Sequence, residues 1–184
     1  MKPILPIRSG RLRPLTDNDT SDLLDLLRLP EIRRYLCDDR IVQRSEVEHL
    51  IEESIQHDID GLGLWVIEID DYSFAGIVGM MPVSSTIAEM PGMKGGIEPF
   101  VALAPQTQGQ GLAREAMAAI LEHTVNMQET AHVVAAVDAP NMRSHRLMRA
   151  TGFGPFAMEN GPANELVLYK LCLSKHRLRG DVGH

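Results

Sequence analysis

The spacing of apolar residues changes along this chain and separates helical segments from extended ones. Apolar residues three and four positions apart predict a helix that begins at Thr16, where Asp19 completes a capping box, and that ends at Pro30. The capping pair Ser45 and Glu48 predicts the start of a second helix with the same spacing. Both helices come before the first long run of strand-forming residues.

Runs of alternating or continuous apolar residues predict the strands. A turn at Asp70 and Asp71 separates two of them, and Pro99 predicts a bulge or a distorted edge in a third. The connection 82–94 is expected to be partly a strand extension with a hairpin and partly a mobile flap. The predicted strands are 11–15, 64–69, 74–81, 97–103, 131–137 and 165–171.

Two helices are expected between the last three strands. The longer one carries an apolar face formed by Ala113, Ala116, Met117, Ile120, Leu121 and Thr124, and the shorter one, 141–150, ends at Gly152-Phe153. This order of elements predicts a mixed α/β (α+β) sandwich around one sheet. A chain of 184 residues suits one domain over 1–184, with a core at about 11–171 and a polar tail at 172–184.

Composition excludes some classes of protein. The formal charge of −7 repels phosphate backbones, so nucleic acid is not an expected partner. That charge either attracts a cationic substrate such as an amine or only keeps the protein in solution. No apolar run approaches the roughly 20 residues of a membrane span, and prolines interrupt the first residues, so neither a membrane nor a secretory signal is expected. Cys37 and Cys172 can form a lone disulfide, but free thiols in a reducing cytoplasm are the favoured expectation.

A glycine-containing segment stands between a predicted strand and the long helix; it consists of Gln108, Gly109, Gln110, Gly111, Leu112 and Ala113. Amide groups in the first turn of a helix lack intrahelical partners, and the helix dipole makes that end positive. Glycines remove the side chains that would keep an anion away. The segment therefore indicates a pyrophosphate site, although a Gly-x-Gly turn can also be only structural. It matches neither the Rossmann nor the Walker pattern.

A second motif follows about thirty residues later, where Asn141 comes after a predicted buried strand. With it, the chain resembles the GCN5-related N-acetyltransferases (GNAT superfamily) from about residue 11 to 171. The most specific parts are Gln108-x-x-Gly111-x-Ala113 and Asn141-x-x-Ser144-x-x-Leu147-x-x-x-x-Gly152-Phe153. The chain looks most like the RimJ/RimL-like branch, ribosomal-protein N-terminal acetyltransferases, because 12–15 and 104–111 are typical of that branch.

This resemblance implies a cofactor, a sheet and a reaction. The cofactor is acetyl-CoA, and the sheet is mixed and mostly antiparallel, with helices on both faces and with strands 97–103 and 131–137 splayed around the pantetheine arm. Backbone amides of 108–113 would hold the pyrophosphate, Leu103 and its neighbours would pair with the pantetheine amides, and Asn141 would fix the arm from the other side. A neutral amine, from a protein N-terminus or a small molecule, attacks the thioester directly. Members of the family often form homodimers.

The reaction needs a base, donors for the oxyanion and an acid for the thiolate. Many members use a tyrosine seven residues after the asparagine as the acid, but Met148 stands there. The resemblance makes Ser144 the candidate donor, although it can equally be a helix residue with local hydrogen bonds. Glu98 matches a carboxylate that acts as the base, directly or through water, or that attracts the ammonium group; alternatively it only faces solvent. Glu165 is a weaker second base.

Other interpretations are weaker or remain open. Ser144 and His145 are adjacent on a helix and point in different directions, so they do not form a catalytic pair, and the histidines show no zinc spacing, so no metal is expected. A CoA-binding module without transferase activity, which would act as a sensor or partner domain, remains an alternative. So does an α/β domain whose glycines are only structural. Residues 35–44 and 82–94 are expected to line the acceptor side.

Overall fold

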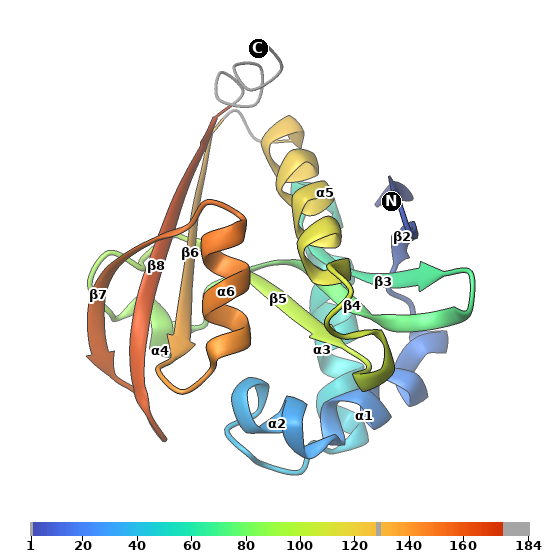
Figure 1. Cartoon of the computed structure of the whole chain (residues 1–184), viewed down its shortest axis with the longest axis horizontal. Coiled ribbons are helices and arrows are strands. Elements are labelled where there is room, and N and C mark those ends of the chain that lie inside the picture. The colour runs from blue at the N-terminus through green and yellow to red at the C-terminus, as the bar shows by residue number, and fades with distance from the viewer. Residues whose placement is uncertain (1, 128–129, 175–184) are drawn as a thin grey trace.

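The computed structural model describes residues 2–127 and 130–174, and it contains one sheet with helices on both of its faces (Figure 1). The strands are β1 Leu5–Ile7, β2 Gly10–Pro14, β3 Gly63–Ile69, β4 Tyr72–Pro82, β5 Ile97–Leu103, β6 Thr130–Asp138, β7 Gly154–Asn160 and β8 Glu165–Ser174. The α-helices are α1 Thr20–Arg28, α2 Pro30–Leu36, α3 Arg44–Gln56, α4 Ser85–Ala88, α5 Leu112–Met127 and α6 Met142–Ala150. Three short 3-10 turns complete the elements, η1 Asp17–Asp19, η2 His57–Asp60 and η3 Pro105–Thr107.

The sheet has eight strands in the order β1-β2-β3-β4-β5-β6-β8-β7. All neighbouring strands are antiparallel except β5 and β6, which are parallel. Among the residues that the structure describes, β5 and β6 pair at one position, Ile97 with Val133. The prediction of a mixed, mostly antiparallel sheet with splayed central strands is confirmed.

Hydrophobic clusters fill the space between the sheet and its helices. One cluster lies between the sheet and the pair α5 and α6, which stand in front of the sheet in Figure 1, and includes Met117, Ile120 and Phe153. A second lies under α1 and α3 and includes Leu23 and Ile51. Alternate residues of each strand point to opposite faces, so the two faces are built from interleaved sets of side chains. The predicted apolar face of α5 is confirmed, since its residues are buried or pack against the first cluster.

Several local predictions need correction. β1, α2 and β7 were not predicted from the sequence. α1 ends at Arg28, before Pro30 as predicted, but Pro30 also begins α2, because a proline fits the first turn of a helix. The capping pair of α3 is Gln43 and Glu46, where the Gln43 N–H donates to Oε2 of Glu46 at 2.8 Å, instead of Ser45 and Glu48. Residues 172–174 belong to β8, and the remainder of the expected tail, 175–184, lies outside the described residues.

Pro99 pairs with Met80 in an unbroken β4 ladder, so no bulge lies there; the other alternative, a distorted edge, fits the β6 side, where pairing with β5 is described only at Ile97. The Ala104 N–H donates to the carbonyl of Ala75, and the Val83 N–H donates to that of Gly96. Hydrogen-bonded and non-hydrogen-bonded pairs alternate in an antiparallel ladder, so even-numbered residues of β5 bond to β4 and odd-numbered ones direct their main-chain groups toward β6. Proline has no N–H, and at Pro99 that group would face the side where β5 and β6 diverge. The hydrogen bonds between β5 and β4 are therefore all retained.

The N-terminal segment is fixed to the body of the protein by a buried lysine. Lys2 is 4% exposed, and its Nζ lies 2.9 Å from Oδ1 of Asp58 and 2.9 Å from Oγ of Ser54. The same ammonium lies over the ring of Trp65, 4.9 Å from the ring centre. Burial lowers the pKa of Lys2, and the Asp58 carboxylate opposes that effect. The cluster ties the start of the chain to α3, η2 and β3.

Candidate active site

The central feature of the site is the place where β5 and β6 stop pairing with each other beyond Ile97, which we call the slit. Odd-numbered residues of β5 point their main-chain groups toward β6, and beyond Ile97 the described residues contain no β6 partner for them. The N–H and C=O groups of Val101 and Leu103 therefore face the slit. An extended ligand with amide groups can pair with them as an additional strand would. Val101 was not among the site residues predicted from the sequence. It is identified by the pairing of β5 with β4, in which odd-numbered residues of β5 direct their main-chain groups away from β4.

The predicted anion-binding segment leads from the end of β5 to the start of α5. Oγ1 of Thr107 donates to the carbonyls of Ala75 at 3.0 Å and of Ala104 at 2.9 Å, which fixes the beginning of the segment against β4. Gly109 and Gly111 have φ angles of +77° and +81°, which favour glycine. A Cβ atom at either position would have no neighbouring atom within 4 Å, so the surface beside these glycines is open. The segment leaves room for an anion at the positive end of α5.

The side chain of Gln108 links the end of β5 to the start of α6. Its Nε2 donates to the carbonyl of Leu103 at 2.9 Å, and its Oε1 accepts a hydrogen bond from Nη1 of Arg143 in the first turn of α6. The side chain is therefore committed to protein groups, which leaves the main-chain amide of this residue for a ligand. Arg143 was not among the predicted site residues.

Asn141 and Ser144 lie together at the start of α6. Asn141 is the N-cap of this helix, and its Oδ1 accepts from the Ser144 N–H at 3.2 Å. The capping bond stabilises the first turn by satisfying an amide without an intrahelical partner. The Asn141 side-chain N–H groups can therefore still donate to a ligand. Ser144 is half-buried.

His145 anchors the same turn to the sheet and takes no part in a catalytic pair with Ser144. Its Nε2 lies 3.1 Å from the Ala139 carbonyl, and its Nδ1 lies 2.9 Å from the Tyr169 hydroxyl. A carbonyl can only accept, so Nε2 carries the proton and Nδ1 accepts from Tyr169. Both ring nitrogens are thus occupied. The arrangement holds the start of α6, and with it Asn141 and Ser144, against β6 and β8.

Glu98 lies on the opposite face of the sheet from α5 and α6. Ile97 packs in the cluster under those helices, so the next side chain, Glu98, points to the side of α1 and α3, where Phe100 follows it. Burial raises the pKa of Glu98 to about 7, and a hydrogen bond from the Ser84 main chain partly opposes the rise. A carboxyl group with this pKa exchanges a proton near neutral pH, as a general base must.

Glu165 does not join Glu98. It is exposed at the first position of β8, and alternation places it on the face of Val167 and Tyr169, which pack in the cluster under α5 and α6. The two candidate bases therefore lie on different faces of the sheet.

The two segments expected on the acceptor side have different structures. Residues 82–94 form no hairpin; they contain α4 and turns, and they pack through the fully buried Met93 against β6 and β8. In the other segment, Asp38 and Asp39 have left-handed φ angles of 50° and 56°, and Nε of Arg33 lies 2.8 Å from Asp39 Oδ1. Burial raises the pKa of the Cys37 thiol to about 11, in keeping with the expected free thiol.

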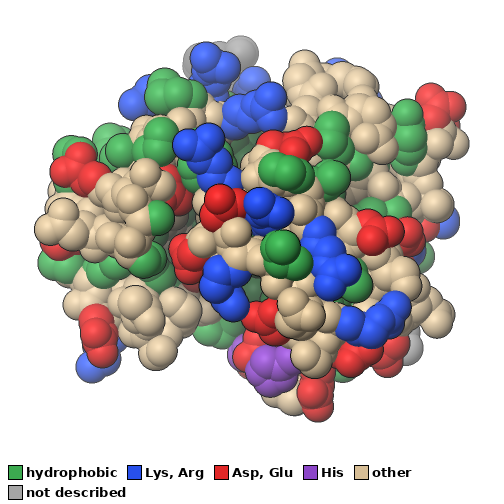
Figure 2. Space-filling model, turned by 90° about the horizontal axis from the view of Figure 1, so that it is seen from below, with side chains coloured by type: hydrophobic (Ala, Val, Ile, Leu, Met, Phe, Trp, Pro, Cys, Tyr) green, Lys and Arg blue, Asp and Glu red, His purple; other side chains and the backbone are tan. Residues whose placement is uncertain are grey.

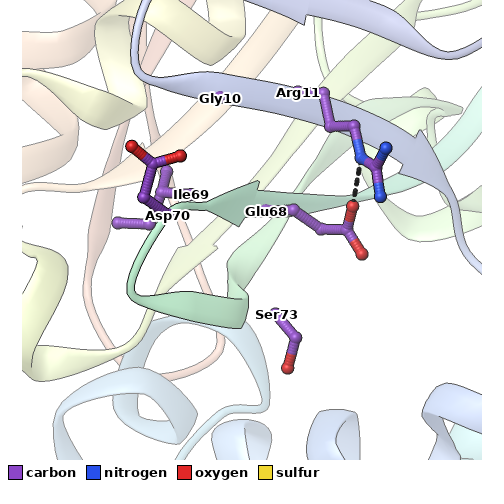
Figure 3. Close-up of a pocket in the computed structure, with 6 residues that line it drawn as sticks. All are labelled: Gly10, Arg11, Glu68, Ile69, Asp70 and Ser73. Carbon is purple, nitrogen blue, oxygen red and sulfur yellow. Dashed lines mark hydrogen bonds and ion pairs between the residues drawn. The ribbon is translucent and has the colours of Figure 1, made fainter.

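A surface pocket of about 420 Å³ lies away from these residues (Figure 3). It is lined by Gly10, Arg11, Glu68, Ile69, Asp70 and Ser73, around the turn between β3 and β4. Arg11 and Glu68 point toward one another and form an ion pair, and Asp70 adds a further carboxylate to the lining. None of the predicted site residues lines this pocket, so it belongs to a different part of the molecule.

Charge on the lower face of the molecule is mixed. Figure 2 shows basic and acidic side chains side by side on the face around α2, without a uniform sign. The net charge of −7 thus does not create a single acidic surface here. Among the described residues, no helix is long and apolar enough to cross a membrane.

Comparisons with known proteins agree with this geometry. A GNAT-family acetyltransferase from Bordetella pertussis has 20% identity and a TM-score of 0.76, with 92% of this chain and 99% of that chain covered. RimL, a ribosomal L7/L12 alpha-N-protein acetyltransferase in complex with coenzyme A, has 15% identity and a TM-score of 0.72, with 93% and 98% covered. Spermidine N-acetyltransferase from Vibrio cholerae, in complex with CoA and spermine, has 20% identity and a TM-score of 0.68, with 90% and 96% covered.

These three structures share the fold of this chain at low sequence identity. The family profile of the acetyltransferase (GNAT) domain matches residues 11–154, which include the slit, the segment before α5 and the whole of α6. Because this match spans most of the sequence, the protein belongs to the GNAT family of acetyltransferases.

Proposed function

We propose that this protein transfers the acetyl group of acetyl-CoA to a primary amine, and that residues 1–184 act as one acyltransferase domain. The observation that carries the proposal is the open edge of β5, which leads directly into the glycine-containing segment before α5. This edge offers amide pairing to a pantetheine arm, and the segment offers main-chain N–H groups to a pyrophosphate. Membership of an acetyltransferase family favours a transferase over a binding module without activity.

The donor would lie with its phosphates on the α5 side of the sheet. In this arrangement the amides of 108–113 hold the pyrophosphate, Val101 and Leu103 pair with the arm, and Asn141 contacts the arm from α6. The thioester then enters the slit between β5 and β6. The acceptor would reach it from the other face, where Glu98 lies, so the two substrates meet without sharing an entrance.

In the chemical step, the nitrogen lone pair of the amine attacks the thioester carbonyl carbon and the carbon–sulfur bond breaks. Glu98 takes the proton that the nitrogen loses, directly or through water, because burial raises its pKa to about 7. The departing sulfur needs a proton or a hydrogen bond. Met148 is 3% exposed and cannot donate one, so we assign this role to the hydroxyl of Ser144.

Ser144→Ala tests this assignment. The change leaves the main-chain bond to Asn141 in place, and we expect kcat to fall about 10- to 100-fold while the Kd for CoA changes less than about threefold. Single-turnover rates and calorimetry measure the two quantities. A variant that retains the wild-type rate would leave Ser144 with a structural role only.

The acceptor is either a protein N-terminus or a small-molecule amine. Two of the similar structures represent these classes, since RimL is an alpha-N-protein acetyltransferase and the Vibrio cholerae enzyme is a spermidine N-acetyltransferase. We favour the first class because the motifs at 12–15 and 104–111 are typical of the RimJ/RimL-like branch. A cytoplasmic location and a homodimer stay predictions from the sequence.

The experiment that tests the function measures release of free thiol from acetyl-CoA in the presence of peptides with different N-termini and a panel of small amines. We expect thiol release that requires an amine and that produces one acetylated amine for each thiol. Thiol release without any dependence on an amine would indicate thioester hydrolysis. CoA binding without thiol release would support the sensor or partner module instead.

A further inference from the structure

Arg143 is the charged side chain that the structure adds to the donor site. It is exposed on the first turn of α6, and its Nη1 donates to Oε1 of Gln108, the first residue of the anion-binding segment. Gln108 in turn donates from Nε2 to the Leu103 carbonyl at 2.9 Å. This contact holds the guanidinium of Arg143 beside the anion-binding segment, although Arg143 lies on α6, 35 residues after Gln108 in the chain.

The charge of Arg143 is not neutralised by a carboxylate in the part of the chain that the structure describes. Arg11, Arg13, Arg33, Arg40 and Arg44 each lie within 4.0 Å of an acidic oxygen, whereas Arg143 is absent from the ion pairs of residues 2–127 and 130–174. Its recorded partner is the neutral amide of Gln108, and a guanidinium has further N–H groups that remain available.

The position of Arg143 near the N-terminus of α5 is unfavourable for its positive charge unless an anion is bound there. The N-terminus of α5 carries the positive end of the helix dipole, whereas the side chains of Arg114 and Glu115 in its first turn have opposite charges. Arg143 adds a positive group near this helix end and raises the local potential. An anion bound on 108–113 would interact favourably with both the helix dipole and Arg143.

We infer that Arg143 binds a phosphate group of the acyl donor directly and so makes this enzyme selective for phosphorylated donors over phosphate-free thioesters. The inference rests on the proposed function. Gln108 holds the guanidinium in place before the donor binds, so little side-chain freedom is lost on binding. Arginine suits the task because its planar N–H groups form paired hydrogen bonds with phosphate oxygens.

Arg143→Gln removes the charge and retains an amide donor for Gln108. With acetyl-CoA we expect kcat/KM to fall about 10- to 100-fold, mainly through KM, because a charge-assisted hydrogen bond to phosphate is lost. With S-acetylpantetheine, which has no phosphate, we expect a change of less than about threefold. Arg143→Lys should recover part of the loss, since it keeps the charge. Arg149→Gln, an equally exposed arginine in the last turn of the same helix, serves as the matched control.

Acetyl-3′-dephospho-CoA distinguishes the two sources of phosphate. A loss that persists with this donor assigns Arg143 to the pyrophosphate, and a loss that disappears assigns it to the 3′-phosphate. An equal loss with S-acetylpantetheine would overturn the inference, because Arg143 would then act only by holding Gln108 and Leu103. An unchanged KM for acetyl-CoA would also overturn it. If the wild-type protein neither binds CoA nor releases thiol, the proposed function fails instead.

Discussion

Gly111→Trp is expected to abolish CoA binding, with the Kd raised more than about 100-fold, while the protein remains folded. The position has an open surface, since a Cβ there would meet nothing within 4 Å, so the indole can occupy the space of the pyrophosphate without a clash inside the protein. The left-handed φ of +81° adds a strain of roughly 1–2 kcal/mol, which a domain of this size can tolerate. Calorimetry with CoA measures the binding.

Two further variants separate filling of the site from strain in the main chain. Gly111→Ala introduces the same strain with a much smaller side chain, so it should retain most of the affinity. Gly95→Trp places an indole at a glycine with a similar φ of +73° and equally open surroundings, but outside the anion-binding segment. If Gly111→Trp still binds CoA with wild-type affinity, the segment before α5 is not the phosphate site, and the assignment of residues 108–113 has to be abandoned.

Glu98→Gln is expected to lower kcat/KM for the amine about 100-fold or more, since general bases contribute on that scale. The pKa of about 7 predicts that wild-type activity rises with pH through this region, as the carboxylate forms. The variant should lose that rise and retain only the part of the profile that follows the amine. Glu165→Gln changes the second candidate and should leave the profile intact. A Glu98→Gln profile that coincides with the wild-type curve would remove this residue from the mechanism.

Stability gives an independent view of Glu98. Its pKa in the folded state lies above the ordinary value of 4.5, so the neutral form is favoured by folding, and the associated stability is present below pH 4.5 and lost as pH rises through about 7. The rise corresponds to roughly 3 kcal/mol. The advantage of Glu98→Gln over the wild type in free energy of unfolding should therefore grow between about pH 4.5 and about pH 7 and level off at higher pH. A Glu98 that faced solvent would show no such change.

The sequence could suggest the donor half of the proposed site because local signals define it. The spacing of apolar residues in α5, the glycines before it and the sequence Gly152-Phe153 after α6 each act within one element and its neighbouring turn. The fold class followed from the order of these elements and from the family resemblance. The same local signals could not show which residues of β5 direct their main-chain groups toward β6, because this depends on how β5 pairs with β4.

The elements that escaped prediction are short or carry ambiguous residues. β1 has three residues, one of which is Pro6, and β7 begins with Gly154-Pro155 on the outer edge of the sheet. In a sequence, a proline after a helical pattern indicates the end of the helix, but Pro30 also suits the first turn of a new helix, α2. The contact of Arg143 with Gln108 joins two elements across the site, so only the folded chain reveals it.

The buried amine of Lys2 bears on how this acetyltransferase could modify itself. A lowered pKa leaves more of an amine in the neutral, nucleophilic form, which would make Lys2 a favourable acceptor by its chemistry alone. Its 4% exposure keeps acetyl donors away from it, whereas Lys94 and Lys170 are exposed. Self-acetylation in the native state should thus fall on the exposed lysines. An acetyl group on the side chain of Lys2 would mark molecules whose N-terminal segment had detached from Asp58 and Trp65.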